Sequence, residues 1–256
     1  MQKIGYYRKS GELFLQNLSL KKLVDHYGTP TFVYDSNLIK NSFYMLKKIM
    51  DPLNGKIHFA VKSNDNLGVI KYINSLGAGA DVVSIGELKR CLKVSVKPKD
   101  IIFSGVGKQK DEIEFAINKN IKQLNAESIE ELKDIIEISK NIKKKVNVAL
   151  RVNLDINAKT HKKISTGDEN SKFGIIYDDI VNAYKLINEA SFIKPYGLAI
   201  HVGSQLFDYD VFFQTFSKIK NLAVELRNLG YEVNHLDLGG GFGVDYTMKN
   251  SLNYKS

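Results

Sequence analysis

Among the residues that could do chemistry, Lys62 has the most informative position, because it stands directly after a short apolar run in the stretch IHFAVKSN. Ile57–Val61 is apolar and contains β-branched residues, which is typical of a buried strand in a parallel sheet. A lysine at the carboxyl end of such a strand lies at the mouth of an α/β fold, where ligands bind. There a desolvated amine loses its proton easily and forms a Schiff base with an aldehyde. The alternative is a lysine whose ammonium group extends into solvent.

A second candidate is the run Gly239, Gly240 and Gly241, which follows the last predicted strand in LDLGGGFG. Consecutive glycines let the backbone approach an anion closely and offer it several N–H donors. In a (β/α) barrel the loops after strands seven and eight are the usual phosphate site. Glycines also form tight turns, but this position in the predicted fold favours phosphate binding.

His201 and Ser204 stand at the end of another predicted strand, in AIHVGSQL. An imidazole at that end of a strand projects into the mouth of the fold, where it can lie flat against a cofactor ring. The Ser204 hydroxyl can donate a hydrogen bond to a phosphate group. The alternative for His201 is a structural histidine with a hydrogen-bonded ring, and the sequence leaves the two open.

Three charged residues complete the set of candidates. Arg151 ends a predicted strand in ALRVN, and a buried arginine needs a partner, either a phenolate oxygen of a cofactor or a carboxylate in a structural ion pair. Asp81, in GADVVS, can orient or balance charged groups at the same mouth. Glu87 can act there too, or it can be only the carboxylate of a capping box with Ser84.

From residue 57 onward, short apolar runs alternate with longer amphipathic stretches, which predicts a parallel sheet with helical crossovers. Capping boxes, Ser84 with Glu87 and Ser128 with Glu131, announce two of the helices. The predicted strands are Ile57–Val61, Ala80–Val83, Ile101–Phe103, Lys122–Asn125, Asn147–Val152, Gly197–Val202 and His235–Leu238. The predicted helices are Asn66–Ser75, Gly86–Leu92, Lys108–Asn118, Ile129–Lys140, Asp178–Asn188 and Tyr209–Asn228.

Seven strands are predicted, whereas a (β/α) barrel closes with eight. We therefore expect a barrel that lacks its last strand and leaves two strand edges unpaired. Either Thr31–Tyr34, in TPTFVYD, takes the eighth place or the chain is incomplete, and we favour incompleteness. Residues 1–35, with short strands in GELFLQ and TPTFVYD around a helix over Leu20–Tyr27, are expected to begin a β domain, and residues 36–256 to form the barrel. The polar stretch Asp155–Lys172 is a long loop, typical of a functional or disordered segment.

The composition is that of a globular protein, with 43% hydrophobic and 25% charged residues and a net charge of +9. The lysines are spread through predicted helices without a stripe of interleaved aromatic residues, which argues against a nucleic-acid surface. The dense run Lys143–Lys145 ends a predicted helix, where the helix dipole explains it. Cys91, the only cysteine, has helical spacing from Leu88 and Leu92 and is expected to be a packed thiol. No apolar run is long enough to span a membrane, so we expect a cytoplasmic protein with neither a membrane nor a nucleic-acid partner.

The motifs FAVKSN, GADVVSIGEL, FSGVGK, NAES, RVN, AKTHKKISTG, SKFGI, IHVGSQL and LDLGGGFG span nearly the whole chain. In type and order they resemble those of the diaminopimelate decarboxylases, which belong with the alanine racemases and ornithine decarboxylases to the fold-type III pyridoxal-phosphate enzymes. AKTHKKISTG followed by KFGI resembles the diaminopimelate branch more than the ornithine branch. The resemblance implies an α/β fold, a (β/α)8-type barrel of the alanine racemase kind, and pyridoxal 5'-phosphate as the cofactor.

The resemblance also implies a role for the candidate residues. Lys62 would bind the aldehyde of pyridoxal phosphate as a Schiff base, and His201 would stack on the pyridine ring. The triple glycine and Ser204 would hold the phosphate. From their own positions at the predicted mouth, Arg151 and Asp81 are expected to be further cofactor-binding residues. The implied reaction is decarboxylation of meso-diaminopimelate to L-lysine, so the expected partner is a small amino-acid substrate.

The sequence also departs from the family pattern. Members are longer, and beyond the point where this chain stops they carry an EPGR-type motif whose Glu pairs with the pyridine nitrogen and whose Arg binds substrate. A Cys and a Tyr further on complete the site across a dimer interface, and Cys91 does not match the motif of that cysteine. We therefore expect a homodimer only where a C-terminal part is present, and little or no activity from this chain alone. The alternatives are a pyridoxal-phosphate-binding barrel protein without turnover and a decarboxylase of the ornithine or carboxynorspermidine branch.

Overall fold

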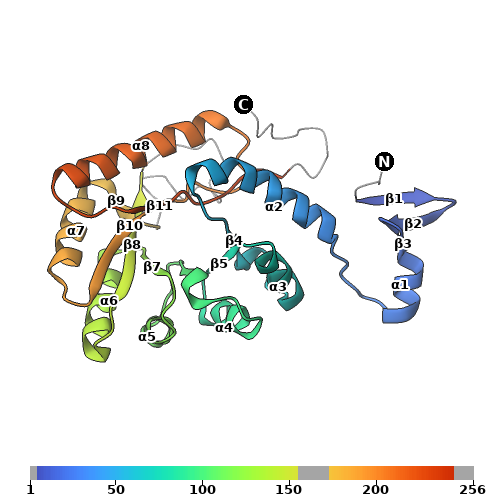
Figure 1. Ribbon diagram of the computed structural model, residues 1–256, viewed down its shortest axis with the longest axis horizontal. Helices are drawn as coiled ribbons and strands as arrows, with labels where there is room; N and C mark the ends of the chain where they lie inside the picture. The colour runs from blue at the N-terminus through green and yellow to red at the C-terminus, as the bar shows by residue number, and fades with distance from the viewer. Residues whose placement is uncertain (1–4, 155–172, 245–256) are drawn as a thin grey trace.

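The computed structural model describes residues 5–154 and 173–244 of the chain. The first elements are β1 (Tyr6–Lys9), β2 (Glu12–Leu15), β3 (Leu18–Ser19), α1 (Leu20–Tyr27) and α2 (Ser36–Met50). The alternating units that follow are β4 (His58–Ala60), α3 (Leu67–Ser75), β5 (Gly79–Val82), α4 (Ile85–Lys93), β6 (Ile101–Phe103), α5 (Lys110–Asn118), β7 (Gln123–Ala126), α6 (Ile129–Ile142), β8 (Val146–Asn153), β9 (Ile175–Ile176), α7 (Ile180–Glu189), β10 (Ile193–Ala199), α8 (Tyr209–Asn228) and β11 (His235–Asp237). Figure 1 shows the helices around the outside of a curved sheet, with β1–β3 and α1 set to one side.

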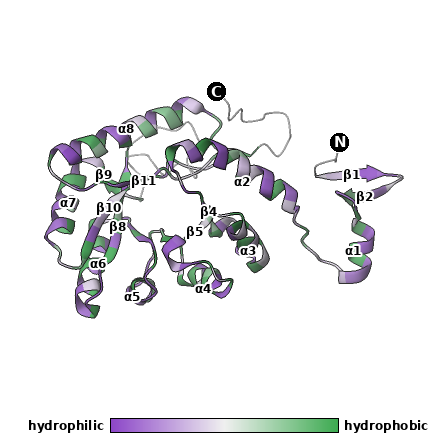
Figure 2. Cartoon of the chain, in the orientation of Figure 1, coloured by the Kyte–Doolittle hydropathy of each residue, from purple (hydrophilic) through white to green (hydrophobic). Residues whose placement is uncertain are grey.

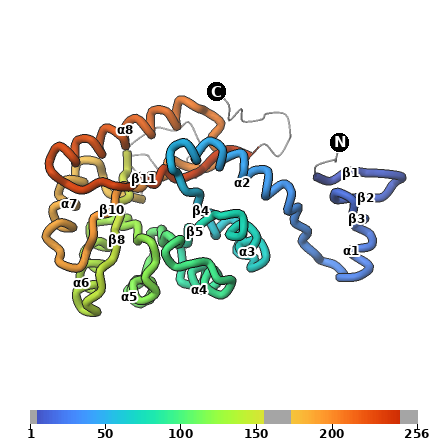
Figure 3. Tube along the Cα trace, in the orientation of Figure 1, coloured from blue at the N-terminus to red at the C-terminus, as the bar shows by residue number. Residues whose placement is uncertain are grey.

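In the described part of the chain, seven strands form one parallel sheet in the order β4-β5-β6-β7-β8-β10-β11, and the short strand β9 pairs with β8 beside this path. The sheet curves into a half-barrel, and Figure 3 follows the chain around it from β4 to β11. The predicted α/β barrel with seven main strands is therefore confirmed. Among the described residues, each of the edge strands β4 and β11 has a single strand neighbour.

The two faces of the sheet differ in chemistry, because alternate side chains of a strand point to opposite faces. Val82, Leu124 and Leu150 point outward and are fully buried in the main apolar core under the helices. Burial of each such side chain stabilises the fold by about 1.5–3 kcal/mol. In Figure 2 the helices accordingly carry apolar and polar residues on different sides. Asp81 and Asn125 alternate with the apolar residues and belong to a polar inner face.

Strand β10 differs from its prediction, since it covers Ile193–Ala199 and not Gly197–Val202. Its first part contains Pro195, which has no N–H group and normally interrupts a strand. The register against β8 shifts between Pro195 and Gly197, so an irregularity in the ladder accommodates the proline. A glycine is required at position 197, where β10 pairs with β11, because a Cβ atom there would lie 1.8 Å from the carbonyl oxygen of His235.

The N-terminal segment forms a separate three-stranded antiparallel sheet, in the order β1-β2-β3. The strand expected in GELFLQ is present as β2, whereas the strand expected in TPTFVYD is wrong, since Thr31–Tyr34 is irregular. Phe32 is 86% exposed, and Thr31–Tyr34 pairs with no described strand, so the segment does not take the eighth place in the half-barrel. Helix α2, which the sequence analysis missed, begins after Asp35, whose carboxylate accepts hydrogen bonds from the N–H groups of residues 37 and 38.

Both predicted capping boxes lie at helix starts. Ser84 Oγ accepts a hydrogen bond from the N–H group of Glu87 at 3.3 Å, and Ser128 Oγ accepts one from Glu131 at 3.1 Å. The glutamate half of the motif reaches one residue further back than expected, because Glu87 Oε2 accepts from the N–H group of Val83 at 2.9 Å. Each cap contributes on the order of 1 kcal/mol and fixes where the helix begins.

Other expectations concern groups away from the mouth. Cys91 is fully buried in α4, and burial raises the pKa of its thiol to about 12, so the prediction of a packed thiol is confirmed. Lys143–Lys145 directly follow the end of α6, as predicted. Within the described ranges, no helix has both the length and the apolar character needed to cross a bilayer.

Candidate functional site

Lys62 lies just beyond β4, in the 3-10 helix Val61–Ser63. The turn is anchored by Val61, which is fully buried, and by a hydrogen bond that Ser63 Oγ donates to the carbonyl oxygen of Ala60 at 2.7 Å. The residue is thus at the predicted end of its strand. Its side chain is exposed, however, so the expectation of a desolvated amine is wrong. The amine is accessible at the mouth of the half-barrel.

Asp81 faces the inside of the half-barrel from β5, with Ala60 opposite it on β4. Its Oδ1 accepts a hydrogen bond of 2.6 Å from the hydroxyl group of Ser104. Burial, followed by the negative charge of Asp237, raises the pKa of Asp81 to about 7. The Ser104 hydrogen bond and the positive charge of Lys62 act in the opposite direction. Asp81 is therefore an acid that exchanges its proton near neutral pH within the field of Lys62.

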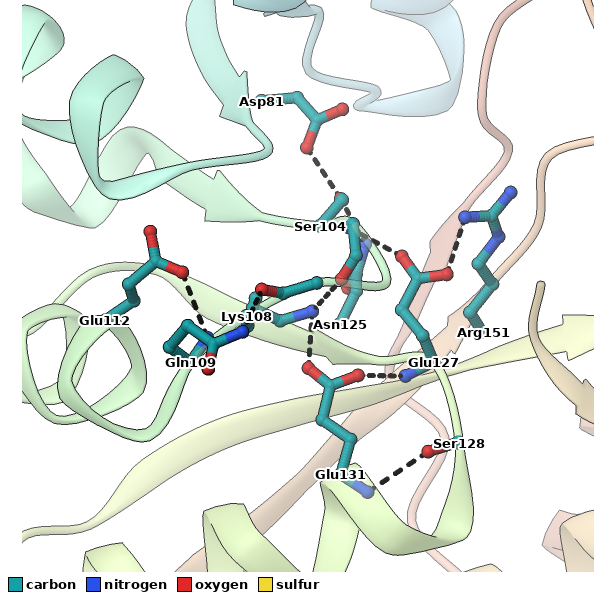
Figure 4. Close-up of polar contacts among 12 residues, drawn as sticks. Asp81, Ser104, Lys108, Gln109, Glu112, Asn125, Glu127, Ser128, Glu131 and Arg151 are labelled. Atoms are coloured by element: carbon teal, nitrogen blue, oxygen red, sulfur yellow. Dashed lines mark hydrogen bonds and ion pairs between the residues drawn. The ribbon is translucent and has the colours of Figure 1, made fainter. Parts of the chain in front are cut away.

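Arg151 points into the same mouth from β8, where its partner is Glu127 (Figure 4). Arg151 Nη1 donates to Glu127 Oε2 at 2.6 Å, and Glu127 Oε1 accepts from the N–H group of Gly105 at 2.6 Å. A carboxylate, one of the two partners considered for the arginine, is therefore present. The ring of Phe173 lies 5.5 Å from the Arg151 guanidinium carbon and covers it.

Glu127 is itself held by Glu131, which sequence analysis treated only as a helix cap. Glu131 Oε2 accepts from the N–H group of Glu127 at 2.9 Å, and its Oε1 pairs with the ammonium group of Lys108 at 2.5 Å. The Lys108 side chain is fully buried, and its ammonium group also donates to the carbonyl oxygen of Gly105. Figure 4 shows this chain of contacts between the loop after β6 and the start of α6. The loops of two successive units are therefore fixed to each other.

His201 lies two residues beyond β10 and is partly buried. Burial, then the positive charges of Arg151 and Lys62, lowers the pKa of its imidazole to about 4. The ring is therefore neutral at pH 7 and has the form that packs against an aromatic ring without a charge to solvate. The backbone leading to it continues the sheet, since the N–H group of Ile200 donates to the carbonyl oxygen of Asp237 at 2.9 Å.

The three glycines after β11 have different surroundings. A Cβ atom on Gly239 would lie 2.3 Å from the carbonyl oxygen of Ile200, and one on Gly241 would lie 1.9 Å from that of Gly203. Both glycines also have positive φ angles, of 70° and 90°. Gly240 differs, because a Cβ atom there would meet no atom of the described residues within 4 Å. Two glycines thus pack the turn against the loop after β10, and the middle one faces open space.

The loops after β10 and β11 are joined around this turn. The N–H group of Leu206 donates to the carbonyl oxygen of Gly241 at 2.9 Å, and that of Gly243 donates to Leu206 at 2.8 Å. The pairing brings Ser204, which is partly buried, to the same side of the mouth as the glycine turn. The backbone N–H groups of Gly240 and Gly241 have no acceptor within the described part of the chain.

These features fit the cofactor that the sequence suggests. The open space at Gly240 and its N–H group suit a phosphate, which binds where backbone donors converge and no side chain intervenes. The accessible Lys62 amine suits an aldehyde, and the neutral imidazole of His201 suits an aromatic ring. The motif AKTHKKISTG lies outside the described residues.

Sequence analysis missed four polar residues at this mouth: Ser104, Asn125, Glu127 and Asp237. A signal for them existed, since Gln123 and Asn125 are polar at every second position of an otherwise apolar strand. Such alternation indicates a strand with one polar face. The quoted motifs FSGVGK, NAES and LDLGGGFG contain all four, but within these motifs only the three glycines of LDLGGGFG were predicted to be site residues.

The fold and sequence are similar to those of known decarboxylases. The family described as "Pyridoxal-dependent decarboxylase, pyridoxal binding domain" matches residues 36–255. The diaminopimelate decarboxylase of Neisseria meningitidis serogroup B is 40% identical over 238 residues, which is 93% of this chain and 58% of that protein. Crystal structures of diaminopimelate decarboxylases complexed with L-lysine also match. The Helicobacter pylori enzyme has a TM-score of 0.87 at 37% identity, over 90% of this chain and 59% of its own. The M. jannaschii enzyme has a TM-score of 0.88 at 34% identity, over 97% and 59%.

The chain therefore spans a little more than half the length of these relatives. The family match begins at the first residue of α2 and includes all strands of the half-barrel. The residues at its mouth, from Lys62 to the glycine turn, fall within the same match. On this basis the chain belongs to the pyridoxal-dependent decarboxylase family, through its pyridoxal-binding domain.

Proposed function

We propose that the chain binds pyridoxal phosphate through Lys62 and serves the decarboxylation of meso-diaminopimelate to L-lysine. The observation that carries the proposal is the arrangement at one mouth of an accessible amine, a neutral imidazole and a glycine turn in which the N–H groups of Gly240 and Gly241 have no acceptor among the described residues. The substrate is inferred from the relatives, because the diaminopimelate decarboxylases of Neisseria meningitidis serogroup B and Vibrio cholerae are 40% and 36% identical. The lysine/ornithine decarboxylase of Vibrio vulnificus, at 21% identity, shares the fold alone.

In this proposal each side chain has a physical task. Lys62 would bind the cofactor aldehyde through its amine, and His201 would pack its neutral ring against the cofactor ring. The N–H groups at Gly240 and the hydroxyl of Ser204 bind the phosphate. Arg151, already oriented by Glu127, supplies a fixed positive charge at the mouth. The cofactor, when bound, accepts the electron pair that remains after loss of CO2.

Other residues around the site hold a proton or pack one side of the mouth. Asp81 can hold a proton near neutral pH, within the field of the Lys62 amine. The ion pair of Arg151 and the ring of Phe173 keep that side of the mouth packed. We further propose that residues 36–256 are the cofactor-binding unit and that residues 1–35 belong to a β domain.

The experiment that tests the cofactor proposal is labelling at Lys62. Pyridoxal phosphate added to the purified chain should produce a visible absorption band, and borohydride reduction should fix the cofactor on the Lys62 peptide. Lys62→Ala should abolish the band, whereas Lys71→Ala, at an exposed lysine of α3, should leave it unchanged. Label on other lysines, with Lys62→Ala unaffected, would contradict the proposal.

The substrate proposal needs its own test. Release of CO2 from meso-diaminopimelate and from ornithine should be compared with protein that has been shown to bind pyridoxal phosphate at Lys62. Lysine is measured as the product of the first reaction. Selective turnover of meso-diaminopimelate supports the proposed branch. Turnover of ornithine instead would favour the ornithine branch. Cofactor binding at Lys62 with no detectable turnover of either substrate would favour a cofactor-binding protein without activity.

A further inference from the structure

Asp237 connects the glycine turn with the interior of the half-barrel. It is the last residue of β11, and its Oδ1 accepts a hydrogen bond from the N–H group of Gly239 at 3.0 Å. Its other oxygen, Oδ2, accepts one from the side-chain amide of Asn125 at 3.2 Å. One carboxylate therefore fixes the first residue of the turn and a side chain of β7, 112 positions away in the sequence.

Beyond Asn125 the contacts continue across the inner face of the sheet. Asn125 Nδ2 also donates to Ser104 Oγ at 3.0 Å, and Ser104 Oγ donates to Asp81 Oδ1 at 2.6 Å. Gln123 Nε2 donates to Asn125 Oδ1 at 2.6 Å and orients the amide. Figure 4 shows Ser104 between Asp81 and Asn125. Asn125 is 3% exposed, so its amide has little access to water and depends on these partners.

Asp237 and Asp81, the two acids at the ends of this series of hydrogen bonds, also influence each other electrostatically. After burial, the negative charge of Asp237 is the next cause that raises the pKa of Asp81. The hydrogen bond from Ser104 lowers the same pKa, as does the charge of Lys62. A change at either Asp237 or Ser104 therefore reaches the acid beside Lys62, in opposite directions.

We propose that Asp237 is a positioning residue for an anionic ligand at the glycine turn, and that Asn125 and Ser104 link it to Asp81 beside Lys62. The turn has a positive φ at Gly239, and a hydrogen bond that holds this conformation before binding lowers the entropic cost of ordering it. The identity of the ligand as a phosphate-bearing cofactor rests on the proposed function. The hydrogen bonds that connect Asp237 with Asp81 do not depend on the proposed function.

The first test is cofactor affinity, measured by titrating pyridoxal phosphate into the purified chain. Asp237→Ala should weaken binding by about 10- to 100-fold, because a hydrogen bond to a charged acceptor is lost. Asp237→Asn keeps an oxygen for Gly239 but places an amide group near that of Asn125, so its loss should be smaller. The matched control is Glu232→Ala, which removes an exposed carboxylate five residues earlier, and it should bind like the wild type. Wild-type affinity in Asp237→Ala would overturn the proposal.

The second test needs neither cofactor nor activity. Carbon-13 NMR of labelled aspartates in the cofactor-free chain, with Asp81 assigned by Asp81→Asn, follows its titration. Asp237→Asn should lower the pKa of Asp81, and Ser104→Ala should raise it. A general loss of structure would not move the pKa in opposite directions in the two variants. An unchanged pKa of Asp81 in both would overturn the link.

The cofactor titration and the NMR titration together distinguish a failure of this proposal from a failure of the proposed function. If the wild-type chain binds no pyridoxal phosphate at Lys62, the proposed function fails, and the NMR arm alone decides whether Asp237 and Asp81 are linked. If the wild type binds and Asp237→Ala binds equally well, the proposed function stands and the positioning role fails. Should Asp237→Ala not fold, Asp237→Asn and Ser104→Ala carry both measurements.

Discussion

Glu127 and Arg151 form an ion pair at the ends of adjacent strands, with Glu127 Oε2 2.6 Å from Arg151 Nη1. Since Ala126 of β7 lies opposite Leu150 of β8, the next residues along each strand face each other at the mouth. The glutamate side chain is 2% exposed and the arginine 13%, so water screens the pair little. The arginine is consequently oriented by the protein before any ligand binds.

Replacement of Glu127 by Gln should therefore destabilise the fold. The variant leaves the guanidinium of Arg151 without its charged partner, and loss of one member of a buried pair costs about 3 kcal/mol. Urea unfolding of the cofactor-free chain measures the change. The control is Lys47→Gln, which breaks the exposed pair with Asp51 and should cost about 0.5 kcal/mol or less. Equal losses in the two variants would show that the Glu127 pair is no better shielded than a surface pair.

The three glycines should separate into two classes when each is changed to alanine. Gly239→Ala and Gly241→Ala should lower the free energy of unfolding by about 1–3 kcal/mol each, because the new methyl group meets backbone carbonyls and φ is positive. Gly240→Ala should fold normally and bind pyridoxal phosphate less well, since its methyl group enters the open space of the turn. Gly240→Leu should weaken binding further.

Urea unfolding and cofactor titration of the same variants check this. Replacement of Lys144 by Gln, in the run after α6, reports on general charge and should affect cofactor binding far less. If the Lys144 variant lost as much affinity as Gly240→Leu, general charge and not the turn would hold the cofactor.

His58 should make the fold less stable in acid. Burial, then the charges of Lys122 and Lys56, lowers the pKa of its imidazole from 6.5 to about 3. Below pH 6.5 the unfolded chain therefore binds a proton that the folded chain does not, so stability falls as pH decreases toward 3. The slope for one such group is at most about 1.4 kcal/mol per pH unit.

His58→Gln should remove this part of the pH dependence, because the amide does not titrate. The difference in unfolding free energy between wild type and variant, measured from about pH 8 to about pH 5, should shift in favour of the variant as the pH falls. At the upper end both side chains are neutral, so that point serves as the internal reference. Parallel curves over the whole range would contradict the prediction.

The purified chain, without any added protein, should release little CO2 from meso-diaminopimelate. Lys62 is exposed, and within the described residues β4 and β11 each have one strand neighbour, so water reaches the mouth. Charge–charge and hydrogen-bond stabilisation of a reacting group is weaker where water enters, and one lost preorganised contact costs about 10²–10³ in rate. The Helicobacter pylori relative, assayed in parallel, is the reference. A rate equal to that of the relative would refute the expectation.

Much of the half-barrel is predictable from the sequence, because its signals are local. The apolar runs around Ile101–Phe103 and Val146–Asn153 and the caps at Ser84 and Ser128 need only neighbouring residues to form. Thr31–Tyr34 did not form a strand for the converse reason, since it pairs with no described strand and leaves Phe32 and Tyr34 exposed. A β-like composition becomes a strand only where another edge pairs with it.

The sequence by itself also determined which chemical groups reach the mouth, because residues at the carboxyl ends of parallel strands meet there whatever the details of packing. Only the tertiary structure decided how these groups act. It gave Arg151 its partner Glu127, left Lys62 exposed, and joined Asn125 to Asp237 across 112 positions. It also gave Gly240 open surroundings, whereas Gly239 and Gly241, its neighbours in the same run of glycines, pack against backbone carbonyl groups. Such differences depend on burial and on the register between strands, which are set by contacts between residues distant along the chain.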